Sequence, residues 1–600
     1  MRFSRGRTRR IGGLLTGLTL ALPGALAAAA QTSITDAAEA TVPGTSLVGL
    51  ASDPHADSDA LIDAAIAARI GWLNRDDGRV SLAALEPWPR LQRLLGLHLH
   101  EADDHQKAVR LAATLAAKDD RLVDELAPLI AAMAVVHDRQ IGSHPHLSGA
   151  SADAPEQVYS HFVRHRRQLI FDPRETPVRL LAFMVNPRAP VQELAWAIDH
   201  YGGNSDVGSR FHDIRYDYAY FKTGREREVM RHGYSLPNVR KYGGVCADQA
   251  YFAATVGKSI GVPSAYVVGV GGDVSHAWVG FLDVRRGKRP AWNFDAGRYE
   301  VYQGVRGRLE DPQTGDWIDD SRVGLTAGSL GRNETQRLTA LALAEAAREL
   351  TGVRPSMFDP VDEDAPEPDS ANQAGSSEAN AEADASPDPQ TEAALAIVRR
   401  ALEANPYEPR VWDVLADLAE ADRLTHEQKA VWASALMRLC GDAYPDFTFD
   451  VLRPLIRTID DPRRAHEVWE RLRPMARQRK DVLAAIRMEQ ASAWREAGEP
   501  KRAWACYQDV VNTHVNDGPF VLSALQEMNA MVIARGKPEA AAAVYQGAWA
   551  KADKPGGMAE EFMRQSNYVR LGRAYADLLE SLGDTRSASR VHQQIERVLN

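Results

Sequence analysis

The sequence predicts an α+β core, in which one helix packs on an antiparallel sheet, flanked by all-α helical regions and followed by an α-solenoid. Three observations carry this prediction. Apolar residues recur at helical spacing through residues 59–136 and 391–600. Residues 241–305 hold one helix-like run followed by three short β-like runs. Glycine-centred phrases repeat in the C-terminal part of the chain, as they do in helical repeat arrays.

The composition is that of a globular protein with several domains. The chain has 600 residues, more than one hydrophobic core accommodates, and is 44% hydrophobic and 25% charged. A net charge of −10 and the lack of a basic stripe give no electrostatic reason to expect nucleic-acid binding. Three cysteines cannot form a disulfide framework, so at least one thiol is free or bonded elsewhere.

The first thirty residues have the pattern of a cleaved signal peptide. Five arginines precede an apolar run at Ile11–Leu26, and the alanines at 27–30 suit signal peptidase. A twin-arginine signal at Arg9-Arg10 and an uncleaved membrane anchor are alternatives, although the apolar run is short for a membrane span. We expect a bacterial protein that is exported, periplasmic or secreted, with no stable membrane span after cleavage.

The sequence pattern divides the chain into six segments. The clearest boundary is an acidic stretch in which no Lys or Arg occurs between Arg354 and Arg399, because such a composition cannot bury a core and repels itself. The predicted segments are a signal peptide at 1–30, a flexible leader at 31–57, a helical region at 58–156, a core domain at 157–352, an acidic disordered linker at 353–392 and helical repeats at 393–600.

Within the predicted core domain, the stretch before the chemistry-bearing motifs combines helix-like and strand-like patterns. Val191–Tyr201 has helical spacing and is closed by two glycines. Ile214–Phe221 alternates in the manner typical of a strand. Glu226–His232 is predicted to be helical again.

Several other reactive residues are interpreted as structural. His144, His146 and His161 are taken as solvated loop residues rather than metal ligands, because no Cys or carboxylate lies nearby at ligand spacing. Cys440 and Cys506 are taken as small buried apolar residues on repeat helices. No metal and no cofactor is expected.

Three short motifs place a thiol, an imidazole and a carboxylate close together in the sequence. They are Gly243–Gln249 around Cys246, Ser275–Trp278 around His276, and Asn293–Asp295. A thiolate nucleophile needs a base to deprotonate it and an anion to orient the base. These three motifs therefore offer every group that thiol catalysis requires.

Cys246 is predicted at the start of a helix, directly after the turn-like Gly243-Gly244. The free N–H groups and the dipole of a helix N-terminus favour a thiolate, which lowers the thiol pKa from about 8.5, and can hold an oxyanion. Asp248 suits the dipole in the first turn, and it opposes the thiolate only weakly if its side chain points outward.

A register argument places the carboxylate against the imidazole. The β-like runs are Ala265–Val270, Ser275–Leu282 and Ala291–Phe294, the first two joined by a hairpin turn at Gly271-Gly272-Asp273. His276 and Asp295 are equidistant from a turn centred between Arg285 and Arg286. Residues that face each other on antiparallel strands lie about 4.5–5.5 Å apart. The spacing thus predicts a Cys-His-Asp triad.

In this order and spacing, the three motifs resemble those of the transglutaminase-like superfamily, over roughly residues 180–305. The resemblance implies a papain-like core in residues 157–352, with Cys246 as nucleophile, His276 as base and Asp295 as its orienter. Trp278, in a typical His-Ala-Trp phrase, is expected to bind substrate or to pack in the core. No acidic cluster suggests the calcium sites of animal members. The family's further oxyanion donor stays unassigned among Tyr216, Tyr218 and Tyr220.

The C-terminal segment resembles a tetratricopeptide repeat region. Gly498, Gly536 and Gly583 each stand in a turn that is followed by small residues, with an aromatic residue after the first two. Their spacings of 38 and 47 residues exceed the usual period of about 34, so we expect a degenerate array, with a plain helical bundle as the alternative. The resemblance implies a protein partner for this segment.

Together these features predict a cysteine protease-like thiol hydrolase or transferase that acts on a peptide or protein. Cys246 forms a thioester and His276 protonates the leaving amine; water then gives a peptidase or amidase, and a second amine gives a protein-glutamine acyltransferase-like enzyme. The alternative is a catalytically idle transglutaminase-like fold that serves as a peptide- or protein-binding scaffold. A third hypothesis is a cell-wall amidase, although nothing in the chain resembles a glycan-binding module.

Overall fold

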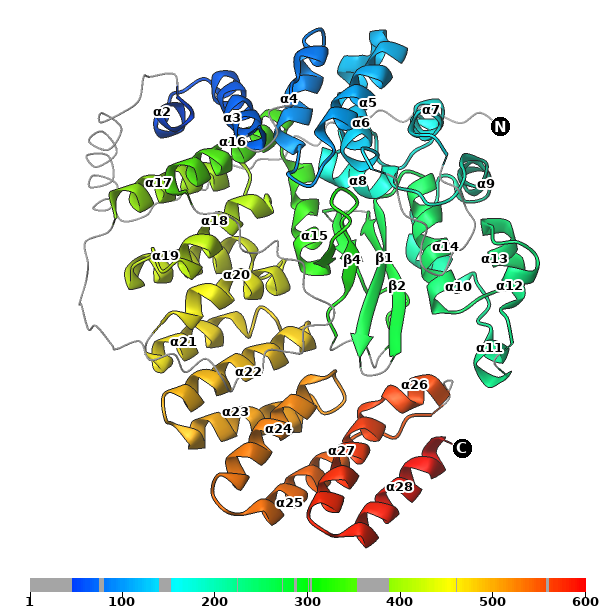
Figure 1. The fold of residues 1–600 in the computed structure, drawn as a ribbon, viewed down its shortest axis with the longest axis vertical. Helices are drawn as coiled ribbons and strands as arrows, with labels where there is room; N and C mark the ends of the chain where they lie inside the picture. The colour runs from blue at the N-terminus through cyan, green and yellow to red at the C-terminus, as the bar shows by residue number, and fades with distance from the viewer. Residues whose placement is uncertain are drawn as a thin grey trace, which may run out of the picture.

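The computed structural model describes residues 46–74, 80–139, 153–223, 225–271, 274–284, 289–299, 302, 305–352, 388–459, 461–556 and 560–599. These residues form a mixed α/β structure that is mostly helical and contains one antiparallel sheet of five strands (Figure 1). The expected combination of an antiparallel sheet with flanking helical regions is thereby confirmed. The predicted signal peptide, His144, His146 and most of the acidic linker lie outside the described residues.

The N-terminal helices follow the predicted apolar periodicity. Asp57 and Asp104 each cap a helix by accepting a backbone hydrogen bond from its first turn, which fixes where α3 and α5 begin. The helices of this region are α2 (Leu47–Ser52), α3 (Ser58–Leu73), α4 (Pro89–His98), α5 (His105–Lys118) and α6 (Val123–Val136).

A run of mostly short helices leads to the sheet. They are α7 (Pro155–His165), α8 (Val178–Val185), α9 (Val191–Tyr201), α10 (Val207–His212), α11 (Tyr218–Thr223), α12 (Glu228–Arg231), α13 (Leu236–Tyr242) and α14 (Cys246–Ser259). The strand predicted over 214–221 is wrong for its second half, which is α11. Within the predicted strand, Tyr216 forms an isolated bridge to Gly244. The pairing does not extend further, because Gly244 leads directly into α14.

The sheet has the order β3-β2-β1-β4-β5, with every neighbouring pair antiparallel. Its strands are β1 (Ser264–Gly271), β2 (Val274–Asp283), β3 (Ala291–Asn293), β4 (Arg308–Glu310) and β5 (Trp317–Asp319). After the sheet come α15 (Asp320–Thr326) and α16 (Glu334–Thr351). The long hairpin of β1 and β2 and the helix α14 packed against it form the predicted core arrangement (Figure 1).

The predicted register between β2 and β3 is wrong by three residues. Ala291 pairs with Asp283 and Asn293 pairs with Phe281, so the turn is centred later than predicted. β3 starts at Ala291 as predicted, so the error lies in how the two strands pair and not in where β3 begins. Asp295 therefore lies beyond the end of β3 and does not face His276.

The C-terminal helices form hairpins at the predicted glycines. Gly498, Gly536 and Gly583 have φ values of +71°, +68° and +84°, the left-handed conformation that ends a helix and that glycine adopts without strain. The helices are α17 (Pro389–Ala404), α18 (Pro409–Glu420), α19 (His426–Cys440), α20 (Pro445–Arg457), α21 (Pro462–Leu472), α22 (Lys480–Glu496), α23 (Pro500–Thr513), α24 (Phe520–Ile533), α25 (Pro538–Trp549), α26 (Glu560–Gln565), α27 (Asn567–Ser581) and α28 (Thr585–Leu599).

These helices, α17–α28, form a curved array whose last part returns to the sheet. Figure 1 shows the array descending from α17 and turning so that α26 lies by the hairpin of β1 and β2. In the part of the chain that the structure describes, no helix combines the length and apolarity needed to cross a bilayer.

The hydrophobic cores do not follow the segment boundaries expected from the sequence. One core runs from Leu47 in the N-terminal helices through α16 to Ile486 in α22. A second surrounds α14 and the sheet, and a third joins α22 to α28. Because α16 and α17 pack closely on each other from either end of the acidic segment, the array is docked on the rest of the chain.

Candidate functional site

The loop before α14 is shaped by two glycines. Gly243 has a φ of +83° and a ψ of −172°, a conformation close to glycine-only, and a Cβ there would lie 2.3 Å from the carbonyl oxygen of Arg215. The Gly244 N–H donates to that same carbonyl at 3.0 Å, and the Asp217 N–H donates to the Gly244 carbonyl at 2.8 Å. These bonds fix the direction in which the chain enters α14 and thus the position of Cys246.

We predict that Gly243→Ala destabilises the protein more than Gly203→Ala. Gly203 has a similar φ of +80° but no heavy atom within 4 Å of the added Cβ, so it isolates the cost of the left-handed backbone. That cost is about 1–2 kcal/mol, whereas Gly243→Ala adds the clash with Arg215. Urea denaturation of both variants measures the difference, and equal midpoints would contradict a steric role for this glycine.

Asp248 is buried under this loop, so the condition of an outward-pointing side chain is not met. It is 0% exposed, and its Oδ2 accepts the Val245 N–H at 2.8 Å. Its Oδ1 accepts from the Arg227 guanidinium at 2.6 Å and from the Tyr234 hydroxyl at 2.8 Å. Because the guanidinium compensates its charge, the carboxylate anchors the nucleophile loop without leaving an uncompensated anion near the thiol.

His276 lies on β2 and is 0% exposed. Its Nε2 is 2.8 Å from the carbonyl oxygen of Gly297. A carbonyl can only accept, so Nε2 carries the proton and Nδ1 is the basic nitrogen. Burial lowers the pKa of His276 to about 4, and the bond to Gly297 only partly offsets that effect. The imidazole is therefore neutral near pH 7, the form that a general base requires.

Tyr299 stacks on the imidazole and interacts electrostatically with the thiol. Its ring stacks on His276 with centroids 4.2 Å apart and an interplanar angle of 16°. Burial raises the pKa of Tyr299 to about 12, and the negative charges of a Cys246 thiolate and a Tyr218 phenolate add to the rise. Tyr299 thus stacks on His276 and lies within electrostatic range of Cys246.

Asp295 does not contact the imidazole in this structure. Its side chain is 88% exposed, and its carboxylate lies 3.7 Å from the Arg298 guanidinium. The carbonyl of Gly297 stands where the resemblance implies a carboxylate. Sequence reasoning could not find this acceptor, because every residue has a backbone carbonyl and the residue type therefore gives no signal.

Trp278 is fully buried, which favours the core-packing interpretation over direct substrate contact. It is 0% exposed, and a Cβ on Gly269 would lie 2.4 Å from its ring. The Arg298 guanidinium lies over the Trp278 indole, 5.3 Å from the ring centroid. Trp278 therefore supports the strand that carries His276.

Of the tyrosines considered as oxyanion donors, Tyr218 is electrostatically linked to Tyr299 beside the site. Its ring also lies 4.8 Å from that of Tyr216, and its side chain is 53% exposed. Tyr220 is 37% exposed on the same helix, α11. The further oxyanion donor therefore stays unassigned among the three tyrosines.

The remaining reactive residues have structural surroundings. Among the described residues, no three His, Cys, Asp or Glu side chains are grouped so as to hold a metal ion. His161 is not a solvated loop residue: it lies in α7, is 5% exposed and packs against His165. Burial raises the pKa of Cys440 to about 12 and also raises that of Cys506, so both thiols stay protonated.

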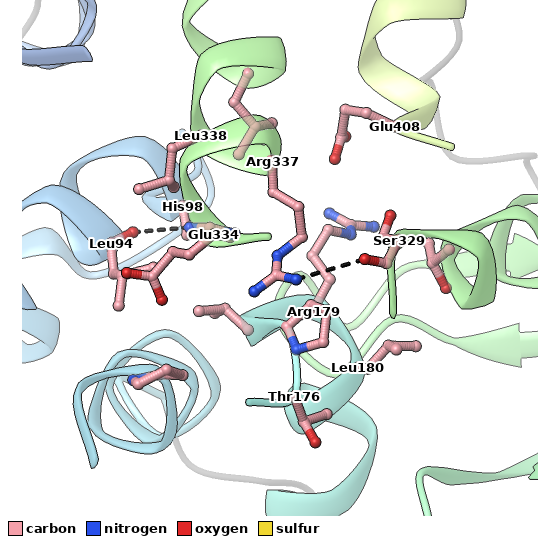
Figure 2. Close-up of a pocket in the computed structure, with 15 residues that line it drawn as sticks. Leu94, His98, Thr176, Arg179, Leu180, Ser329, Glu334, Arg337, Leu338 and Glu408 are labelled. Atoms are coloured by element: carbon pink, nitrogen blue, oxygen red, sulfur yellow. Dashed lines mark hydrogen bonds between the residues drawn. The ribbon is translucent and has the colours of Figure 1, made fainter. Parts of the chain in front are cut away.

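The cavity in Figure 2 lies away from Cys246, between α4, α6, α8 and α16. Its volume of about 30 Å³ has room for about two water molecules, too little for an acyl substrate. Its one histidine, His98, donates from Nδ1 to the Leu94 carbonyl at 2.7 Å, and burial lowers the His98 pKa to about 3. No cysteine is among the residues that line this cavity, so it is not the site of the predicted thiol.

Comparisons with protein-family models, with curated proteins and with solved structures found no match. The contacts around Cys246 and His276 are therefore the ground on which a function can be assigned.

Proposed function

We propose that this chain is an exported, transglutaminase-like thiol enzyme that cleaves or transfers an amide bond through a Cys246 thioester. In this proposal the core is papain-like and the C-terminal array is a TPR-like solenoid that binds a protein partner. One observation carries it: His276 is neutral, buried and oriented through Nε2 beside Tyr299, which lies within electrostatic range of Cys246. A histidine held in this way has Nδ1 as its basic nitrogen, the form that a general base requires.

The chemical steps follow from this arrangement. Nδ1 of His276 takes the thiol proton, and the Cys246 sulfur attacks the carbonyl carbon of an amide. The negative oxygen that forms is held by first-turn amide groups of α14, since the Val245 N–H, which precedes the helix, is already committed to Asp248. The imidazolium then gives its proton to the leaving amine, and a thioester remains. Water or a second amine attacks the thioester and restores the thiol.

Alkylation of Cys246 tests the proposal. Iodoacetamide near pH 7 should label Cys246 at least about tenfold faster in the wild type than in His276→Ala, because the variant lacks the base. Asp295→Asn should label at a rate within about twofold of the wild type, since Gly297 and not Asp295 holds the imidazole. Equal and slow labelling of Cys246 in the wild type and in His276→Ala would refute an activated thiol.

A second candidate is the idle scaffold, and the closure of the site favours it. Cys246 is 8% exposed and His276 is 0% exposed, so a substrate reaches them only if neighbouring groups move. On the array, Ile533 is 52% exposed, an apolar side chain suited to a partner contact. A scaffold is favoured if a strain with Cys246→Ala grows as the wild type does while a strain with Ile533→Glu grows more slowly. Slow growth with Cys246→Ala and normal growth with Ile533→Glu favours the enzyme.

A further inference from the structure

The segment after β3 lies between the catalytic sheet and the C-terminal array. At its start, Gly297 accepts the hydrogen bond of His276. The next residue, Arg298, extends over Trp278 and donates from Nε to the Tyr302 carbonyl at 2.9 Å. Tyr302 itself is 2% exposed, with its ring centroid 4.8 Å from that of His276. This segment therefore forms one wall around the imidazole.

The side chain of Gln565, in the C-terminal array, contacts this wall. The Tyr302 hydroxyl donates a hydrogen bond to Oε1 of Gln565, which ends α26 and lies 263 residues further along the chain. Helix α26 also lies against β2, the strand that carries His276 (Figure 1). The last helices of the array thus contact both the histidine's strand and the aromatic residue packed beside its ring.

We propose that Gln565 is a positioning residue for His276, acting through Tyr302. The proposal rests on the proposed function, since it gives the C-terminal array a role in the reactivity of the same thiol. A buried tyrosine hydroxyl needs an acceptor, and Gln565 supplies the one that holds the Tyr302 ring against the imidazole. The histidine is thereby oriented from two directions: Gly297 fixes Nε2, and Tyr302 fixes the ring plane.

Removing the Gln565 acceptor should disturb the position of the His276 imidazole. Tyr302 shares its short segment with Gly297, and Arg298 joins them by stacking on Trp278 and bonding to the Tyr302 carbonyl. If the Tyr302 ring turns away from His276 to hydrate its hydroxyl, water enters beside the imidazole and the Gly297 carbonyl loses its support. The base then spends less time aligned with Cys246, while the thiol itself is unchanged.

The pH profile of iodoacetamide labelling of Cys246 separates this role from a merely structural one. At pH 6.5, where labelling depends on the base, Gln565→Leu and Tyr302→Phe should each slow it about fivefold, the effect of one ordinary hydrogen bond. At pH 10, where the thiol ionises without help, all variants should label as the wild type does. Gln565→Glu keeps an acceptor oxygen and should restore the rate at pH 6.5. Arg564→Ala, a neighbour on α26 that pairs with Glu560, is the matched control.

The double variant Tyr302→Phe/Gln565→Leu should be no slower than either single variant, because both remove the same bond. Wild-type labelling at pH 6.5 by Gln565→Leu, with slow labelling by His276→Ala, would overturn the positioning role and leave the proposed function standing. Slow, equal labelling by the wild type and His276→Ala would instead remove the proposed function. A rate for Gln565→Leu altered equally at both pH values would assign Gln565 to folding alone and so also overturn the positioning role.

Discussion

Replacing Asp248 with alanine should destabilise the protein by about 3–5 kcal/mol, the usual cost of breaking a buried ion pair by removing one partner. The Arg227 side chain is 13% exposed and would lose the carboxylate that neutralises it. The Val245 N–H and the Tyr234 hydroxyl would lose their acceptor in the same substitution. The loop that presents Cys246 would lose its anchor as well, so labelling of Cys246 should fall together with stability.

Urea denaturation followed by tryptophan fluorescence measures the effect, since Trp278 lies in the same hydrophobic core as α14. The double variant Arg227→Met/Asp248→Asn removes both charges and should be less destabilised than the sum of its single variants. Strict additivity of the two single variants would show that the carboxylate and the guanidinium do not depend on each other. A midpoint for Asp248→Ala near that of the wild type would contradict the anchoring role.

The elements around the nucleophile were predictable because local chemistry determines them. Two glycines before a helix-forming run identify the start of α14, and the alternating runs after it identify β1 and β2. Cys246 and His276 each lie within such an element, so a motif of a few residues sufficed to place them. The strand predicted at 214–221 failed because an alternating pattern needs a partner strand, and Gly244 offers only one residue for pairing.

The hydrogen-bond partner of His276 was not predictable, because it depends on a strand register that no local pattern determines. Ala291 pairs with Asp283, so Asp295 falls outside the sheet and the Gly297 carbonyl reaches Nε2 of His276. A backbone carbonyl leaves no trace in residue type. The pairing of Tyr302 with Gln565 was equally hidden, since no local pattern relates residues that are 263 positions apart.

The docking of the array was also beyond sequence reasoning. An acidic segment marks a break in composition, and the natural expectation is that it separates two bodies. In the structure α16 and α17 pack together from either side of it, within a core that extends from Leu47 to Ile486. Partly buried ion pairs continue the contact, with Arg306 bonding Asp450 at 2.5 Å and Arg322 bonding Asp413 at 2.7 Å. Composition describes the segment itself but not the surfaces that it connects.

Asp320→Asn should stabilise the protein at pH 8 by up to about 4 kcal/mol and leave its stability at pH 4 nearly unchanged. Asp320 begins α15, is 1% exposed, and neither carboxylate oxygen has a hydrogen-bond partner among the described residues. Burial raises its pKa from 3.8 to about 7, against the lowering effect of the Arg479 guanidinium. The folded protein therefore keeps this carboxyl protonated at pH values where the unfolded chain ionises it.

The direction of this pH effect follows from the number of protons that the folded and unfolded states bind. Between about pH 4 and pH 7 the folded state holds one more proton at this site than the unfolded state, so wild-type stability falls as the pH rises, by about 1.4 kcal/mol per unit. Asparagine carries no charge in either state, and the variant lacks this loss. Urea midpoints at pH 4 and pH 8 measure the effect, with Asp295→Asn as the control for an exposed carboxylate. A gain in stability of the same size at both pH values would show that Asp320 does not titrate in this range.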